Sequence, residues 1–462
     1  MCVYKKHTAA GCCLRRSQRW ETLKKRKGRT SFQIIIVSFF GLILTGALLL
    51  MLPISSQERT VTSFSDCLFT STSATCVTGL IVKDTATYWS VFGKTVIITL
   101  IQIGGMGVIT ISLAIMRAAG HKIRFSQLST MKDSISAPQY GGIVRLTGFI
   151  LKGSVIIELA GALLLAPVFI SDFGFAQGLA YAMFHSISAF CNAGFDLMGV
   201  REPFSSLTSY SANIYLNIVI MLLIVIGGIG FLTWKDVMTY RYHFKKYSLQ
   251  SKVIITTSLL LIIIPAVCFF FCEYSDMGMK DRTLSSFFQS VTARTAGFNT
   301  QDLAQMKESG TLLMIVLMLI GGSPGSTAGG MKTVTFAVLF MAARTVFRRR
   351  SDVECFKRRI PDSTVRYAGA ILFLYLMLFI TGGVIISLYE GLPLLTGLFE
   401  TGSAIGTVGL TLGVTPGLSM LSKGILMFLM FFGRVGGLTI IYAAVSSSES
   451  DKGRLPAGTL SI

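Results

Sequence analysis

Positions 399–410 read FETGSAIGTVGL, and three earlier stretches of the chain follow the same pattern. They read FTSTSATCVTGL at 69–80, FHSISAFCNAGF at 184–195 and FFQSVTARTAGF at 287–298. Each begins with Phe, and ten residues later comes a glycine followed by Leu or Phe. A pattern that recurs four times, at intervals of roughly 100–115 residues, indicates a repeated structural unit. Its glycines are Gly79, Gly194, Gly297 and Gly409.

Long apolar segments surround these stretches. Of the 462 residues, 52% are hydrophobic and 14% are charged, which is typical of membrane proteins and not of soluble domains. Apolar segments of about 20 residues cross a bilayer as helices, whereas pieces of 12–16 residues are too short and read as re-entrant. The predicted spans are 32–52, 92–116, 146–170, 212–233, 253–272, 311–343, 367–389 and 424–445. The short pieces are 62–75, 176–191, 281–293 and 394–405.

The order span, short helix, glycine loop and span therefore occurs four times. We expect an all-α polytopic membrane protein whose eight transmembrane helices form four repeats around a central pseudo-fourfold pore. The predicted organisation is a basic N-terminal arm at 1–31, repeats at 32–118, 145–235, 252–344 and 366–446, and a tail at 447–462.

The basic residues gather in a few segments. The net charge is +20, and Lys and Arg concentrate in the N-terminal arm and in the connections 117–145, 235–252 and 344–366. An even number of spans places all of these on one side, which the positive-inside rule assigns to the cytoplasm. We therefore expect a multi-pass plasma-membrane protein with both termini in the cytoplasm. Topology and membrane lipid account for the charge, and no nucleic-acid partner is needed.

The glycine loops predict an ion path. Backbone at membrane depth must be buried in protein or line a water-filled path. Four such loops around an axis would form a ring of carbonyls like a cation filter, and glycine leaves no Cβ to block it. The side chain of Arg294 should point away from this path, because a cation there would repel ions. The predicted ion-binding residues are Cys76, Val77, Thr78, Gly79, Cys191, Asn192, Ala193, Gly194, Arg294, Thr295, Ala296, Gly297, Gly406, Thr407, Val408 and Gly409.

The sixth apolar segment is interrupted at 321–333, which reads GGSPGSTAGGMKT. The second spans share a glycine site at this depth, but only here is it extended, which predicts a mobile gate loop. Its hydroxyls could bond the opposite wall. Arg434, deep in the last span, is the candidate partner, because a charge there faces a cavity or a partner. The predicted gate comprises Gly321, Gly322, Ser323, Pro324, Gly325, Ser326, Thr327, Ala328, Gly329, Gly330 and Arg434.

Catalytic readings of this segment are weak. Positions 321–325 fit G-x-S-x-G, but that motif needs a strand-turn-helix setting and a partnered His, and His185 lies in another repeat. Met331 breaks the spacing of a phosphate-binding loop. The nine cysteines have no zinc-site spacing. We expect no catalytic residues, and an intramembrane hydrolase is a remote alternative.

The fourth loop, TVGLT at 407–411, resembles the filter of potassium channels. Residues 30–445 resemble the Trk/Ktr/HKT superfamily of potassium transporters, with the four glycines, GGSPGSTAGG at 321–330 and FFGRVGG at 431–437 as markers. Eight predicted spans are similar to KtrB-type membrane subunits. The resemblance implies potassium uptake, with K⁺ as the transported ion at the filter carbonyls and no organic cofactor on this chain.

Further expectations rest on the same resemblance. It implies a homodimer on a cytosolic ring of nucleotide-binding regulatory subunits of KtrA/TrkA type. It leaves open whether Na⁺ is a coupling ion. Within the superfamily, serine at the first filter glycine goes with sodium permeation, so Gly79 favours potassium. A sodium-permeable HKT-like transporter is the nearer alternative.

Overall fold

A computed structural model describes residues 31–108, 110–111 and 143–436, and most of them are helical. Four long helices each lead into a short one. The long helices are α2 (Ser31–Met51), α7 (Ile143–Phe173), α11 (Leu249–Cys268) and α15 (Asp362–Glu390). The short helices are α3 (Phe64–Cys76), α8 (Phe175–Cys191), α12 (Met279–Thr292) and α16 (Leu394–Gly406). Each short helix is followed by a loop and a third helix, namely α4 (Val91–Met106), α9 (Ile214–Gly228), α13 (Glu308–Leu319) and α17 (Met420–Val435).

The remaining elements extend or connect these helices. Two helices follow third helices, α10 (Phe231–Tyr240) after α9 and α14 (Thr333–Phe347) after α13, and the π-helical η5 (Phe269–Glu273) continues α11. A hairpin of β1 (Glu354–Cys355) and β2 (Arg358–Arg359) precedes α15. Single 3₁₀ turns are η1 (Pro53–Ser55), η2 (Met198–Val200), η3 (Thr208–Tyr210), η4 (Phe244–Lys246), η6 (Leu303–Gln305) and η7 (Thr415–Gly417).

The helices identify a membrane protein. Among the described residues, four helices are long and apolar enough to cross a bilayer, and α9 with α10 would make a fifth if this bent pair is one span. The four are Gln33–Met51, Val144–Phe173, Leu249–Glu273 and Asp362–Glu390. Their outer faces leave large apolar side chains uncovered, including Leu163 and Leu388, whose exposed fractions are 71% and 79%. Such continuous apolar surface fits contact with lipid.

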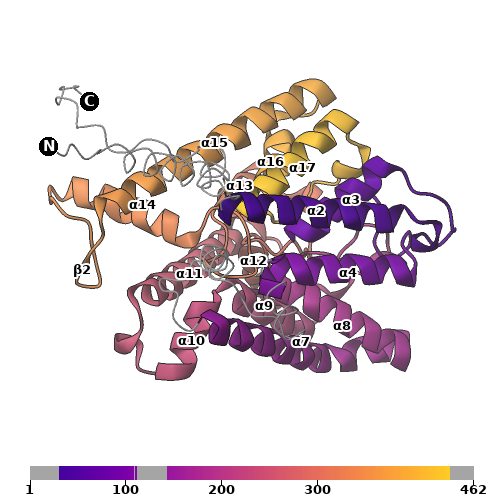
Figure 1. Ribbon diagram of the computed structural model, residues 1–462, viewed down its shortest axis with the longest axis horizontal. Helices are drawn as coiled ribbons and strands as arrows, with labels where there is room; N and C mark the ends of the chain where they lie inside the picture. The colour runs from indigo at the N-terminus through magenta and orange to yellow at the C-terminus, as the bar shows by residue number, and fades with distance from the viewer. Residues whose placement is uncertain (1–30, 109, 112–142, 437–462) are drawn as a thin grey trace, which may run out of the picture.

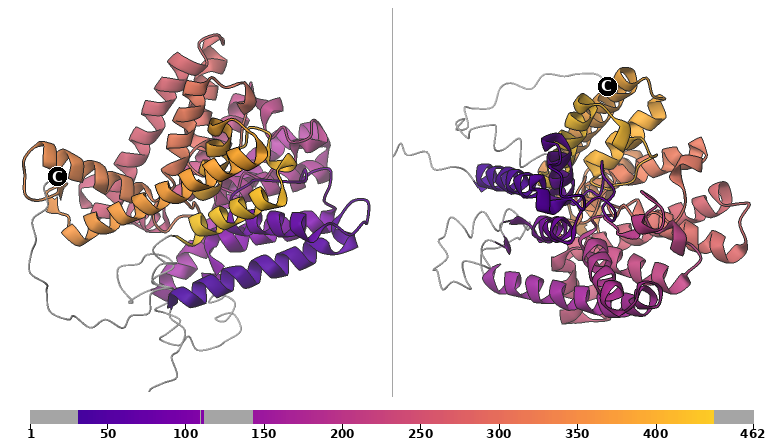
Figure 2. Two further views of the ribbon diagram at one scale, coloured as in Figure 1. Left: turned by 90° about the horizontal axis from the view of Figure 1, so that it is seen from above. Right: turned by 90° about the vertical axis from the view of Figure 1, so that its right-hand side faces the viewer.

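The repeats are arranged around a common centre. Seen from the side in the right view of Figure 2, the colour passes around the centre in chain order. In Figure 1, α14 and the β hairpin lie at the opposite edge of the molecule from the loop that joins α2 to α3. The short helices are mostly inside, because each contributes buried aromatic or apolar side chains to the core.

Burial corrects one detail of the predicted repeat. Phe69 and Phe399, at the start of their stretches, are fully buried, but Phe287 at the start of the third is 41% exposed. Its neighbour Phe288 is fully buried instead. The residues after the four glycines, Leu80, Phe195, Phe298 and Leu410, are all buried.

The predicted span 212–233 is not one straight helix. It divides into α9 and α10, which are bent by 99°. Gly230 adopts a φ of 95°, and the N–H of Phe231 donates to the carbonyl of Gly325, 2.7 Å away. Several predicted segments fall outside the described residues, at least in part: the arm 1–31, the connection 117–145, the tail 447–462 and the ends of the spans 92–116 and 424–445.

Candidate functional site

The four loops share one backbone conformation, because a residue with left-handed φ lies two positions before each repeated glycine. In α3, α8 and α16 this residue directly follows the helix and turns the chain away from it, whereas α12 ends at Thr292 and Thr295 lies within the loop. These residues are Val77 (57°), Asn192 (60°), Thr295 (68°) and Thr407 (51°). The glycines that follow also have positive φ: Gly79 (97°), Gly194 (67°), Gly297 (83°) and Gly409 (93°). Positive φ is readily adopted by glycine and strained for other residues.

The four glycines form a closed ring, which we call the glycine ring. A Cβ added to Gly79 would lie 2.5 Å from the carbonyl oxygen of Ala193, and one added to Gly194 would lie 2.8 Å from that of Ala296. A Cβ added to Gly297 would likewise collide with the carbonyl oxygen of Val408, and one added to Gly409 with that of Thr78. The contacts thus run from each repeat to the next and return to the first. Four loops far apart in the sequence therefore present backbone carbonyls around one axis, with no room for a side chain.

Serine hydroxyls of the short helices form hydrogen bonds with the backbone of these loops. Six residues before the glycine, Ser73 accepts a hydrogen bond from the N–H of Gly79 (3.1 Å), and Ser403 accepts one from Gly409 (3.0 Å). Ser188, at the same offset, donates to the carbonyl of Phe195 at 2.7 Å. The sequence analysis missed these serines, although their common offset in three of the four stretches is a readable signal.

Polar groups further back on the short helices support the residues after the ring. Glu400 is fully buried, and its carboxylate accepts hydrogen bonds from the hydroxyls of Thr411 (2.6 Å) and Thr415 (2.7 Å). His185 occupies the equivalent place in the second repeat, and its Nε2 accepts from the N–H of Leu197 at 3.3 Å. These side chains fix the outgoing chain and do not take part in the ring itself.

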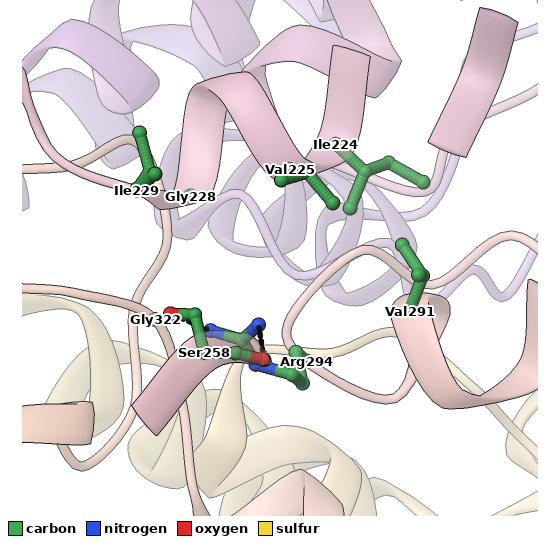
Figure 3. Close-up of a pocket in the computed structure, with 8 residues that line it drawn as sticks. All are labelled: Ile224, Val225, Gly228, Ile229, Ser258, Val291, Arg294 and Gly322. Carbon is green, nitrogen blue, oxygen red and sulfur yellow. Dashed lines mark hydrogen bonds between the residues drawn. The ribbon is translucent and has the colours of Figure 1, made fainter. Parts of the chain in front are cut away.

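Arg294 reaches away from the ring toward a neighbouring helix. Its guanidinium donates to the hydroxyl of Ser258 on α11 at 3.1 Å (Figure 3). The side chain lines a pocket that is also bounded by residues of α9 and by Gly322. The third loop thus contributes its backbone to the ring while its charge lies against α11.

A loop at 320–332 joins α13 to α14 and is tied to two other repeats. Its ends meet, because Ile320 and Met331 form a parallel β-bridge. The N–H of Ser323 donates to the carbonyl of Gly228 at 3.1 Å, and that of Thr327 donates to Gly227 at 3.3 Å. On the other side, the N–H of Gly330 donates to the carbonyl of Gly433 at 3.1 Å. The loop therefore bridges the third helices of the second and fourth repeats.

Arg434 connects this loop to the first repeat. Its guanidinium donates to the carbonyls of Thr327, Gly104 and Gly105, the last at 2.9 Å. The expectation that it would bind the loop's hydroxyls is therefore wrong. The hydroxyl of Thr327 instead donates to the carbonyl of Phe190, 3.0 Å away. The charge of the guanidinium strengthens each of these hydrogen bonds.

A second cation lies in the same loop and was missed. The Nζ of Lys332 donates to the carbonyls of Ala328 (2.9 Å) and Gly329 (3.4 Å). Its position directly after a break in an apolar segment was the available signal, since charges at such depth are usually functional.

Helices of the other repeats also end at a glycine within a predicted span, contrary to the sequence analysis. The helices α4, α9 and α17 are each followed by a glycine with positive φ, namely Gly107 (87°), Gly230 (95°) and Gly436 (89°). Three residues earlier in each lies a glycine that abuts a short helix: an added Cβ on Gly104, Gly227 or Gly433 would collide with the carbonyl of Thr75, Phe190 or Ile405. The spacing G-x-x-G in three repeats was the signal for these helix ends.

Comparison with known proteins agrees with this architecture. The family model described as "TrkH: Cation transport protein" matches residues 6–454. The chain is 40% identical to the "Potassium/sodium uptake protein NtpJ" of Enterococcus hirae, over 90% of this chain and 93% of that protein. It is 39% identical to the "Ktr system potassium uptake protein B" of Bacillus subtilis, over 91% and 94% of the two chains.

A solved structure has the same fold. The crystal structure of the potassium transporter TrkH from Vibrio parahaemolyticus matches 90% of this chain and 85% of its own with a TM-score of 0.69, at 20% identity. The glycine ring, the bridged loop at 320–332 and a family match over nearly the whole length lead to one conclusion. The chain belongs to the TrkH family of cation transport proteins.

Proposed function

We propose that this chain is the potassium-translocating membrane subunit of a Ktr/Trk-type uptake system. The closed glycine ring is the observation that carries the proposal, because backbone carbonyls around an axis can replace the hydration shell of a cation. The names of the relatives from Enterococcus hirae and Bacillus subtilis both specify potassium uptake.

The selectivity filter consists of residues 76–79, 191–194, 294–297 and 406–409, and their backbone carbonyls bind the transported K⁺. The spans are organised as four repeats at 32–118, 145–235, 252–344 and 366–446, which makes eight in all. In this count, α4 and α17 are spans that end at a glycine. The helices α13 and α14 together make one span, which a glycine-rich loop interrupts. The positive-inside rule and the basic segments support a topology with both termini on the cytoplasmic side of the plasma membrane.

The loop at 321–330 and Arg434 act as the gate. The loop lies between the third helices of two repeats, and Arg434 ties it to a third. A cation leaving the ring would meet this covering backbone and the charges of Arg434 and Lys332, which raise the electrostatic barrier in a low-dielectric site. Opening requires these hydrogen bonds to exchange for others, and glycine lets the loop change shape at low cost.

The chain works as a homodimer on a cytosolic ring of nucleotide-binding subunits. Basic residues in the connection 344–366 offer charge for docking such a partner. No step requires catalysis or an organic cofactor on this chain, and Na⁺ serves at most as a coupling ion. A second candidate, a sodium-permeable transporter, is favoured by the word "sodium" in the name of the relative from Enterococcus hirae.

The test is cation uptake by cells that lack their own potassium uptake systems and express this chain with a cognate cytosolic subunit. Initial rates are measured with ⁸⁶Rb⁺ and with ²²Na⁺, each in competition with unlabelled K⁺ and Na⁺. We expect rubidium uptake that K⁺ suppresses and excess Na⁺ does not. Equal suppression by the two ions favours the sodium-permeable candidate. If a membrane-localised chain gives no uptake of either ion, the proposed transport function is wrong.

A further inference from the structure

One face of α14 changes its chemistry halfway along the helix. Phe336, Ala337, Phe340 and Met341 follow helical spacing and form an apolar stripe. One turn further, the same stripe continues as Arg344, and Arg348 follows at the end of the helix. Within about 6 Å along the helix axis, the stripe thus changes from side chains that prefer hydrocarbon to side chains that prefer phosphate or water.

The apolar half faces a groove between α11 and α14. Its walls are almost entirely apolar, and its volume is about 410 Å³. Along α11 the lining runs from Val253 to Pro265, which corresponds to about 18 Å and so to roughly one leaflet of a bilayer. Leu260 and Phe340 leave 52% and 65% of their surface uncovered at this groove.

A basic pocket of about 240 Å³ continues the groove at its end, and Met341, Cys355 and Phe356 line both. The hairpin turn that carries Phe356 and Lys357 forms one wall. Arg344, Arg348, Arg350 and Lys357 also line this pocket, together with Asp352 and Glu354.

The two acids of the pocket are already paired. Arg350 lies 3.6 Å from Glu354, and Arg359 lies 2.9 Å from Asp352. Within the described part of the chain, Arg344, Arg348 and Lys357 have no acidic partner. Three cations therefore surround a space that opens into an apolar groove of one leaflet's depth.

We propose that this composite site binds an anionic phospholipid of the cytoplasmic leaflet. An acyl chain lies in the groove between α11 and α14, and the headgroup phosphate accepts hydrogen bonds from Arg344, Arg348 and Lys357. Charge complementarity selects an anionic over a zwitterionic lipid, since each basic residue near the surface contributes to binding an anionic headgroup. The groove excludes a free phosphate as the main occupant, because its apolar walls would stay exposed.

The site lies on α14, which leaves the gate loop directly. Lys332 and Thr333, where the loop ends and α14 begins, are on the same rigid element as Arg344. A bound lipid would therefore hold the position of α14 and stabilise one arrangement of the loop. This consequence depends on the proposed gate, but the binding site does not.

Native mass spectrometry of the purified full-length chain, without its cytosolic partner, tests the site. Phosphatidylglycerol, phosphatidylcholine and soluble glycerol phosphate are added in separate arms. The double variant Arg344→Gln/Arg348→Gln is compared with the matched control Arg349→Gln/Arg358→Gln, which removes the same charge outside the pocket. Thr256→Trp fills the groove without changing charge, and Thr256 is exposed in the structure.

We expect wild type and the control to retain phosphatidylglycerol, and the pocket variant to bind it about tenfold more weakly. Thr256→Trp should also weaken binding, and neither phosphatidylcholine nor glycerol phosphate should bind comparably. Equal losses in the two double variants would show diffuse surface charge and overturn the proposal. Undiminished binding to Thr256→Trp, or binding of glycerol phosphate alone, would overturn the composite site. Because no transport is measured, failure here is separate from failure of the proposed transport function.

Discussion

At the scale of single residues, the four ring glycines are tightly constrained by their surroundings. Each combines positive φ with a neighbouring backbone carbonyl that leaves no space for a Cβ. Glycine is thus required at these places for two separate reasons, conformation and closeness. The sequence showed which glycines these were, because their spacing repeats. It could not show that they touch, because every contact joins residues about 100 or more positions apart.

Gly79→Ser should weaken selectivity for potassium over sodium. The added Cβ must displace the carbonyl of Ala193, and the hydroxyl offers sodium a new ligand within the ring. Gly413→Ser is the matched control, because Gly413 has a similar φ of 88° but open space around it. Competition of Na⁺ against ⁸⁶Rb⁺ uptake measures the effect. Unchanged competition in Gly79→Ser, with normal expression, would contradict the filter assignment.

Arg434→Ala should raise the rate of uptake severalfold and leave selectivity unchanged. The substitution removes a positive charge from the path and three hydrogen bonds to carbonyls, each worth about 1.5–3 kcal/mol when the donor is charged. The initial rate and the K⁺/Na⁺ competition ratio are measured together. A slower variant with normal membrane levels would assign Arg434 to packing instead of gating.

At the scale of elements, the short helices and the interrupted sixth span were predictable, because hydrophobic length and glycine content report on them directly. The ends of α4, α9 and α17 at glycines with positive φ were not, although G-x-x-G marks all three. Helix packing explains a glycine pair equally well, and only the φ of the later glycine distinguishes a bend from a packing site. The partners of Arg434 could not be predicted either. Every residue has a backbone carbonyl, so the sequence does not show which carbonyls the guanidinium binds.

Shortening the loop at 325–330 should increase flux and reduce dependence on the cytosolic subunit. The deletion removes Thr327 and Gly330, which make the bonds to the second and fourth repeats. Thr327→Val is the conservative comparison, because it removes the hydroxyl bond to Phe190 and keeps the loop's length. Initial rubidium uptake is measured with and without the partner subunit. Lower or equal flux in a well-expressed deletion would favour a structural role for the loop.

At the scale of the whole molecule, four short helices end on one axis and four long helices present apolar faces to the outside. In the proposed function, a cytosolic partner moves the proposed gate. The sequence predicted the repeat from its period, but the closure of four units around a centre follows only from the backbone contacts.

The purified chain should be a dimer and should bind a cognate cytosolic ring subunit in the presence of ATP or ADP. Multi-angle light scattering of the chain alone and with the ring measures both properties. Gln substitutions at Arg349 and Arg358, which lie outside the proposed lipid pocket, should weaken ring binding if the connection 344–366 docks it. A stable monomer that ignores the ring under both nucleotides would remove this part of the proposal.

The central claim, that the glycine ring binds the transported ion, is tested most directly by locating a heavy analogue of potassium. Crystals of the protein grown in rubidium would be measured at the rubidium absorption edge. We predict an anomalous peak on the axis beside the carbonyls of Thr78, Ala193, Ala296 and Val408, and its loss when rubidium is replaced by sodium. Rubidium bound elsewhere, with none at the ring, would contradict the account.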